Sequence, residues 1–184
     1  MRFTPTKFSD AWLIKPKVFR DERGYFLESF SKRRFAEHGI DADFSQDNHS
    51  RSLQTGVLRG LHFQKPPSAQ AKLIRVVCGR IFDVIVDLRK GSETFGQWEG
   101  FELSEENFFI LYVPKGFAHG FCVLEPETDV LYKTDDYYAP ELDSGIIWND
   151  PDLAISWPIS EPLLSKKDSL LPHFAEHDIV FYIT

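Results

Sequence analysis

The chain has little sulfur and no long apolar segment. Its 184 residues include two cysteines and one methionine, and Cys78 and Cys122 lack the CxxC spacing of metal and redox sites. We therefore expect two free thiols in a reducing compartment. No apolar run reaches the roughly 18 residues of a membrane span, and the N-terminus shows no signal-peptide pattern. These absences predict a soluble, cytoplasmic protein that does not bind membranes.

The chain also has no excess of positive charge. Its net charge of −7 argues against binding to nucleic acid, which needs a basic surface. Any phosphate group must therefore be held by a local cluster of cations. Aromatic residues, in contrast, are abundant, with 17 Phe, 6 Tyr and 4 Trp. They supply a large area for burial and, on a cavity wall, flat faces for a planar base.

Repeats, low-complexity linkers and composition shifts are missing too, which predicts one domain over residues 1–184. Short β-rich runs separated by turn residues favour an all-β sandwich or barrel of the jelly-roll type with a few short helices. Ser31–His38 is the best helix candidate, with Ser31 as N-cap and Gly39 ending it. Ten segments are predicted to be strands: Trp12–Phe19, Gly24–Phe30, Phe44–Ser50, Leu58–Gln64, Lys72–Cys78, Arg80–Leu88, Phe95–Leu103, Phe108–Pro114, Phe117–Leu124 and Asp129–Thr134.

The clearest alternation lies in the strand expected at Arg80–Leu88. Asp83 and Asp87 fall on one face of this strand. The other face is apolar and consists of Phe82, Val84, Val86 and Leu88.

The segment Val57–Gln64 is the most informative part of the sequence. It places His62 and Arg59 in an apolar strand interrupted by Gly60. Imidazole is well suited to moving protons near neutral pH, and a guanidinium can hold a phosphate through paired hydrogen bonds. The pair indicates an enzyme that removes a proton from a phosphate-bearing substrate. Strict alternation puts the two side chains on opposite faces, so either Gly60 marks a bulge or Arg59 points to a rim.

Further polar groups occur in apolar or aromatic surroundings along the chain. Each alone has an ordinary structural explanation, such as a turn, a buried tyrosine or an exposed lysine, and it is their combination that indicates chemistry. They lie in the segments 21–28, 45–50, 114–121, 131–133 and 165–168 and at Lys72.

Together these segments resemble the dTDP-4-dehydrorhamnose 3,5-epimerase family over nearly the whole chain, from about Ile14 to Asp168. The resemblance implies a cupin-type jelly roll that works as a homodimer without a metal or other cofactor. In it an N-terminal strand crosses to the partner and completes the partner's site. The matching blocks are residues 18–30, 44–52, 56–64, 72–100, 113–121, 131–151 and 163–168.

The resemblance also implies a role for each site residue. His62 matches the general base, Asp168 the carboxylate that orients it, and Tyr132 the proton donor on the opposite face. Lys72 matches a group near the sugar that could stabilise an oxyanion. The substrate contacts implied by the motifs are Arg23, Glu28, Gln46, Asp47, Asn48, Arg59, Lys72, His119, Asp143 and Lys167, and the possible thymine-stacking residues are Phe26, Tyr137 and Tyr138.

The implied reaction inverts carbons 3 and 5 of dTDP-4-dehydro-6-deoxy-D-glucose, in dTDP-L-rhamnose biosynthesis. A ketone at carbon 4 acidifies both hydrogens, so each centre can invert through an enolate with a base on one face and an acid on the other.

Other functions remain open at the level of sequence. A single-centre epimerase or a keto-isomerase of the same fold would use similar groups. A metal-dependent cupin needs clustered ligands, whereas Gln64 stands where a second ligand would fall after His62. A nucleotide-sugar binding protein would not need His62, Asp168 and Tyr132 together.

Overall fold

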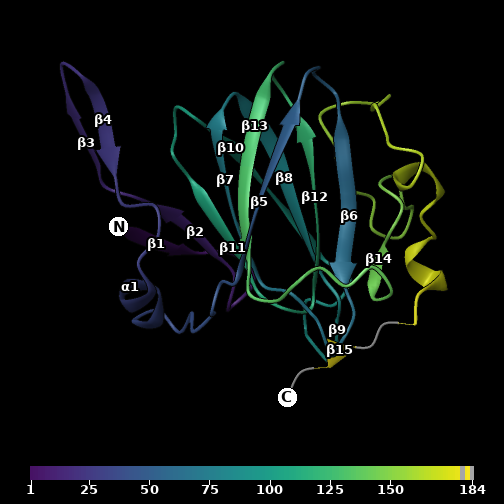
Figure 1. The fold of residues 1–184 in the computed structure, drawn as a ribbon. Coiled ribbons are helices and arrows are strands. Elements are labelled where there is room, and N and C mark those ends of the chain that lie inside the picture. The colour runs from purple at the N-terminus through teal and green to yellow at the C-terminus, as the bar shows by residue number, and fades with distance from the viewer. Residues whose placement is uncertain (179–180, 183–184) are drawn as a thin grey trace.

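The computed structural model describes residues 1–178 and 181–182 and is a cupin-like β-sandwich of two antiparallel sheets (Figure 1). The jelly-roll class expected from the strand pattern is confirmed. The larger sheet runs in the order β1 (Arg2–Pro5), β2 (Trp12–Lys15), β11 (Ile110–Val113), β7 (Lys72–Cys78), β13 (Thr128–Thr134) and β5 (Gln46–Ser52). The smaller sheet runs in the order β10 (Trp98–Ser104), β8 (Arg80–Asp87), β12 (Phe117–Val123), β6 (Leu58–Gln64) and β14 (Asp143–Gly145).

Each of the ten predicted strand segments contains a strand of the structure. The segment Trp12–Phe19 divides into β2 and β3 (Val18–Asp21), because Pro16 interrupts the run. The helix is confirmed as α1 (Lys32–Ala36), followed by Gly39 with a φ of +76°. Sequence patterns missed β1 and the elements of two or three residues, which are too short to show a period: β9 (Arg89–Lys90), β14, β15 (Phe181–Tyr182) and the 3-10 helices η1 (Asp168–Leu170) and η2 (Phe174–Glu176).

The faces predicted for β8 are confirmed, and both are buried. Ile81 and Ile85 point between the two sheets, where they join the central apolar cluster. Val84 and Val86 point the other way and pack beneath residues of the C-terminal segment such as Leu153. Asp83 and Asp87 therefore share the face of β8 that points into the sandwich, where a charge needs a partner.

A bulge in β6 explains how the side chains of Arg59 and His62, three residues apart, can point to the same face of the strand. In the β6–β12 pair, Arg59 lies opposite Phe121 and His62 opposite His119, so two residues of β6 face the single Gly120. Gly60 has a φ of +119°, and a Cβ there would lie 2.6 Å from the Gly120 Cα. Only glycine fits this close approach. The extra residue changes the parity of the strand, so Arg59 and His62 both face the interior.

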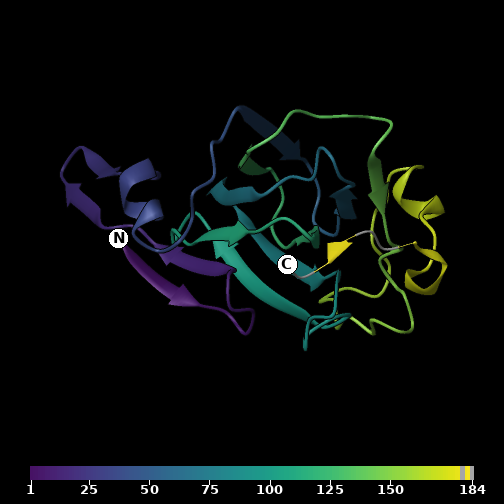
Figure 2. The same ribbon diagram turned by 90° about the horizontal axis from the view of Figure 1, so that it is seen from below.

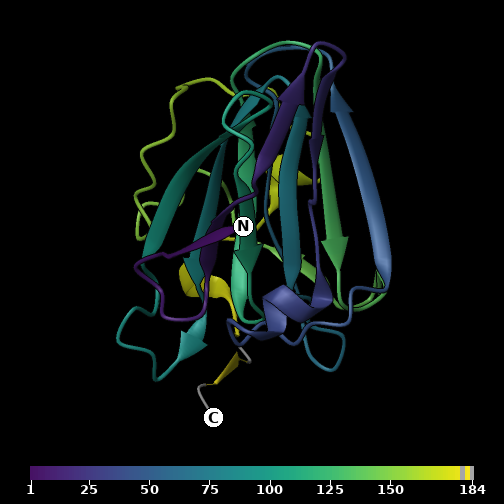
Figure 3. The ribbon, with the colours of Figure 1, turned by 90° about the vertical axis from the view of Figure 1, so that its left-hand side faces the viewer.

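The hairpin of β3 and β4 (Gly24–Leu27) stands apart from the sandwich (Figures 1 and 2). Its strands pair only with each other among the described elements. Three aromatic side chains on it, Phe19, Tyr25 and Phe26, are 52%, 54% and 69% exposed. Seen from the end at which the hairpin projects, α1 lies at the lower end of the sandwich (Figure 3). Across residues 1–178 and 181–182, the helices are all too short or too polar to cross a membrane.

Candidate active site

His62 and Asp168 form a hydrogen-bonded pair inside the sandwich. The His62 Nε2 lies 2.5 Å from the Asp168 Oδ1, and the Ser165 hydroxyl donates to the Asp168 Oδ2 at 2.8 Å. Burial alone would raise the pKa of Asp168, but the hydrogen bonds from His62 and Ser165 and the charge of His62 hold it below its usual value. An ionised Asp168 can fix the tautomer of His62 and stabilise the imidazolium that forms when His62 takes a proton.

The larger sheet supplies the other wall of a cavity of about 290 Å³. Burial raises the pKa of the Tyr132 phenol, so the phenol remains a proton donor at neutral pH. Burial also lowers the pKa of Lys72 to about 8, while the charges of Asp143 and Asp83 oppose that change. The residues around the cavity are Gln46, Asn48, His62, Phe63, Gln64, Gln70, Lys72, Tyr132, Thr134, Tyr138, Asp143 and Lys167.

A polar network surrounds the mouth of this cavity. The Asp143 carboxylate pairs with the Lys167 ammonium and accepts a hydrogen bond from the Tyr138 hydroxyl at 2.8 Å. That hydrogen bond raises the pKa of Tyr138. Gln46 accepts from the Tyr138 backbone N–H at 3.1 Å and donates to the Asn48 side chain at 2.9 Å. The mouth therefore presents a cation, two amides and an aromatic ring to an incoming ligand.

Gln64 holds the wall of the mouth in place, a role that sequence patterns did not assign. Its amide nitrogen donates to the carbonyls of Ser68 at 2.5 Å and Tyr137 at 3.0 Å. Its amide oxygen accepts from the Ala139 N–H at 2.9 Å. The sequence feature that could have indicated this role is the position of Gln64, two residues after His62 in the same strand.

Deeper in the sandwich lies a second imidazole–carboxylate pair. The His119 Nε2 lies 3.0 Å and 2.9 Å from the two carboxylate oxygens of Asp83. Arg59 donates to the Ser52 hydroxyl at 3.3 Å, and its charge acts on Tyr132 by lowering the pKa of the phenol. Sequence patterns placed Asp83 on one face with Asp87 but gave it no function.

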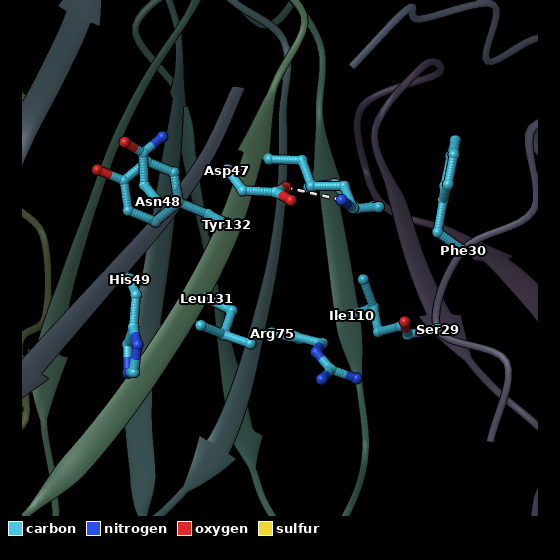
Figure 4. Close-up of a pocket in the computed structure, with 11 residues that line it drawn as sticks. Ser29, Phe30, Asp47, Asn48, His49, Arg75, Ile110, Leu131 and Tyr132 are labelled. Atoms are coloured by element: carbon cyan, nitrogen blue, oxygen red, sulfur yellow. Dashed lines mark hydrogen bonds and ion pairs between the residues drawn. The ribbon is translucent and has the colours of Figure 1, made fainter. Parts of the chain in front are cut away.

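Other predicted contacts lie away from the cavity. Asp47 faces outward from β5 and pairs with Lys133 at 2.7 Å, in the outer-face pocket of Figure 4. Tyr137 is exposed next to Tyr138, outside the cavity lining. The remaining three lie on or just after the projecting hairpin: Arg23, Phe26 and Glu28.

Arg23 and Glu28 bond within their own part of the chain. The Arg23 guanidinium pairs with Asp21 at 2.6 Å on the same hairpin, and Glu28 pairs with Arg34 at 3.3 Å. Within one chain, the interior groups and the mouth residues therefore come together around the cavity, whereas Arg23, Phe26 and Glu28 lie away from it.

The interior arrangement defines a class of protein: a cupin-like sandwich with an acid–base site. A histidine paired with a carboxylate occupies one wall, and a phenol and an ammonium occupy the other. Such a site can remove a proton beside a carbonyl and stabilise the enolate. Among the described residues, three or more His, Cys, Asp or Glu side chains nowhere gather in a way that could hold a metal ion.

Comparison with known proteins agrees with this class. The family model of dTDP-4-dehydrorhamnose 3,5-epimerase matches residues 5–176. The dTDP-4-dehydrorhamnose 3,5-epimerase of Pseudomonas aeruginosa is 52% identical over 180 residues, covering 97% of this chain and 98% of that protein. A dTDP-4-dehydrorhamnose 3-epimerase of Streptomyces niveus is 41% identical, covering 91% of this chain and 81% of that protein.

A solved structure is similar as well. The dTDP-6-deoxy-D-glucose-3,5-epimerase of Legionella pneumophila, in complex with dTDP-4-keto-L-rhamnose, has a TM-score of 0.95 and 46% identity, covering 100% of this chain and 98% of that one. The chain therefore belongs to the dTDP-4-dehydrorhamnose 3,5-epimerase family, as its motifs indicated.

Proposed function

We propose that this protein inverts carbons 3 and 5 of dTDP-4-dehydro-6-deoxy-D-glucose to give dTDP-4-dehydro-L-rhamnose. The observation that carries the proposal is the cavity between His62 on one sheet and Tyr132 on the other. Inversion needs a base and an acid on opposite sides of the same carbon. The family and the full-length similarity support the choice of substrate.

The reaction proceeds through one enolate at each centre. Because the His62 Nε2 is bound to Asp168, the His62 Nδ1 takes the hydrogen from the carbon beside the ketone, and the electron pair moves to the oxygen at carbon 4. Lys72 stabilises this oxyanion as an ammonium. Tyr132 then donates its phenolic proton to the opposite face of the carbon. A proton returned from solvent restores Tyr132, and His62 gives its own proton to solvent, so protons balance over each inversion.

The mouth holds the nucleotide part of the substrate in this proposal. Lys167 at the mouth and Arg59 deeper in the sandwich carry the charge that a diphosphate needs, since the protein as a whole is negative. Tyr138 presents its ring for stacking on thymine while its hydroxyl binds Asp143. Gln46 and Asn48 supply amide groups for the sugar or base.

We further propose a homodimer in which the hairpin of one copy completes the site of the other. The exposed aromatic rings of the hairpin favour burial by a second protein surface. The segment after the hairpin borders a pocket of about 270 Å³ on the outer face of the larger sheet, lined by side chains such as Phe30, Leu131 and Ile110. In the dimer Arg23, Phe26 and Glu28 would reach the partner's ligand.

A single-centre epimerase is the second candidate, favoured by the similarity to the 3-epimerase of Streptomyces niveus. Proton NMR of dTDP-4-dehydro-6-deoxy-D-glucose with the protein in D2O separates the two. Deuterium at both carbon 3 and carbon 5, with product reduced to dTDP-L-rhamnose by an added reductase, supports the double epimerase. Exchange at one carbon alone supports the single-centre enzyme, and binding without exchange contradicts both.

A further inference from the structure

Strand β8 carries two aspartates that are both completely buried, and their surroundings differ. Asp87 accepts hydrogen bonds from the backbone and guanidinium of Arg89, at 2.9–3.0 Å, and from the hydroxyls of Ser92 and Thr94, both at 2.7 Å. Burial alone would raise the pKa of Asp87, but these donors hold it below the usual value. The charge of Asp87 is thus matched within its own loop.

Asp83 has far fewer donors. Among the described residues its hydrogen-bond partner is His119 alone, whose single Nε2–H is shared between two carboxylate oxygens. Burial raises the pKa of Asp83, and the charges of His119 and Lys72 offset part of that rise. A buried carboxylate with one donor needs further positive charge nearby. Lys72, on the facing sheet, is the remaining cation that acts on it.

Lys72 has a matching need for negative charge. The charged groups that act on it are Asp143 from β14, Asp83 from β8 and Lys167 from the segment before η1. Asp143 is already bound to Lys167 and to the Tyr138 hydroxyl at the mouth. Of the two carboxylates that act on Lys72, Asp83 is therefore the one with no ammonium or guanidinium bound to it among the described residues.

We propose that Asp83 is a positioning residue that keeps Lys72 protonated beside the reacting ketone, with His119 holding the carboxylate in place. The role assigned to the ammonium rests on the proposed function, whereas the charge of Lys72 does not. Asp83 is not among the residues that line the cavity, so its negative charge stabilises the ammonium without occupying the place of the substrate.

The proposal fixes the direction of a pH effect. Lys72 acts as an ammonium, so turnover falls as pH rises through its pKa of about 8. Asp83→Asn keeps the shape and an oxygen that can accept from His119 but removes the charge. Burial then acts on Lys72 with less opposition, which lowers its pKa further. The alkaline limb of the kcat profile should therefore move to lower pH.

The test measures the titration of Lys72 directly, in protein labelled with carbon-13 at lysine Cε and without substrate. The Lys72 resonance is identified by its loss in Lys72→Arg. The expected result is a lower pKa in Asp83→Asn, with the same displacement in the pH profile of kcat. Asp87→Asn is the matched control, because it makes the same chemical change at an equally buried position of the same strand. It should lower the melting temperature without moving the pKa of Lys72.

An unchanged Lys72 titration in folded Asp83→Asn would overturn the proposal, as would an equal displacement in Asp87→Asn. Asp83→Ser is the second variant, and it should move the titration in the same direction. If both Asp83 variants fail to fold while Asp87→Asn folds, Asp83 serves folding and the assignment is wrong. The titration involves no substrate, so an inactive wild-type protein would contradict the proposed function while leaving this test intact.

Discussion

The sandwich interior and the β3–β4 hairpin place their functional side chains in opposite ways. In the interior, His62 is held by Asp168 and His119 by Asp83, each pair brought together from distant parts of the chain. On the hairpin, Arg23 binds only its neighbour Asp21 among the described residues, and Phe26 is 69% exposed. The interior groups are thus held by partners within the chain, whereas the hairpin groups are exposed, and in the proposed dimer they contact the other copy.

This difference suits two tasks: the interior groups carry out proton transfer, and the mouth and hairpin groups bind the nucleotide in the proposed function. Proton transfer requires groups held within hydrogen-bond reach of the reacting carbon, and paired strands with buried partners provide that precision. Groups that contact the nucleotide tolerate a looser frame, and a hairpin can carry them to a second copy. Changes to the interior should therefore abolish turnover, while changes at the mouth and hairpin should weaken binding.

The largest effect is expected from His62→Ala. Removing the base should lower the rate of deuterium entry at both carbons by about 10²–10⁴-fold, because no neighbouring group replaces the imidazole. The measurement is exchange into the substrate in D2O, with dTDP binding and melting temperature as controls. Unaltered exchange in a folded variant would remove His62 from the mechanism.

Tyr132→Phe should separate the two halves of the reaction. The base still removes the proton, so deuterium exchange with retention should continue, while inversion falls by about 10²-fold or more for lack of the opposing acid. NMR that distinguishes washed-in deuterium from inverted product measures both. Equal loss of exchange and inversion would assign Tyr132 to binding or to the enolate instead.

The two adjacent tyrosines at the mouth offer a matched pair. Tyr138 lines the cavity and Tyr137 does not, although both are exposed. Tyr138→Ala should raise KM by about tenfold or more with little change in kcat, since stacking on one base contributes roughly 1–3 kcal/mol. Tyr137→Ala should leave both constants unchanged. Similar effects from both substitutions would mean that thymine contacts the pair rather than Tyr138.

The smallest expected effect is on stability at acid pH. The pKa of Asp168 is lowered on folding, so the ionised group stabilises the fold above its unfolded pKa of about 3.9, and this contribution disappears as pH falls through the lower folded value. Urea unfolding of wild type and Asp168→Asn should therefore differ at pH 6 and converge at acid pH. A constant difference would show that the ionisation of Asp168 contributes nothing to stability.

Sequence alone predicted the fold class and most strands, because the alternation is strong and turn residues separate the runs. It could not bring Asp168 to His62, since the two lie 106 residues apart and only family motifs connected them. It did not decide which face of the strand carries the Arg59 side chain, because the bulge depends on the close approach of Gly60 to Gly120 on another strand. Asp83 was placed on the correct face, but its partner His119 comes from β12, and no local pattern reveals that contact.

The most direct test of the division between interior and hairpin is subunit complementation. His62→Ala damages the interior of its own copy, and Arg23→Ala combined with Phe26→Ala damages the hairpin that serves the partner in the proposed dimer. Turnover is measured at a substrate concentration too low for the hairpin variant, with its weakened binding, to react. The two proteins, unfolded and refolded together in equal amounts, should then regain about one quarter of wild-type turnover, because a mixed dimer contains one site with both lesions and one with neither. No recovery, with mixed dimers verified by mass spectrometry, would contradict the account and place the hairpin groups in their own chain's site.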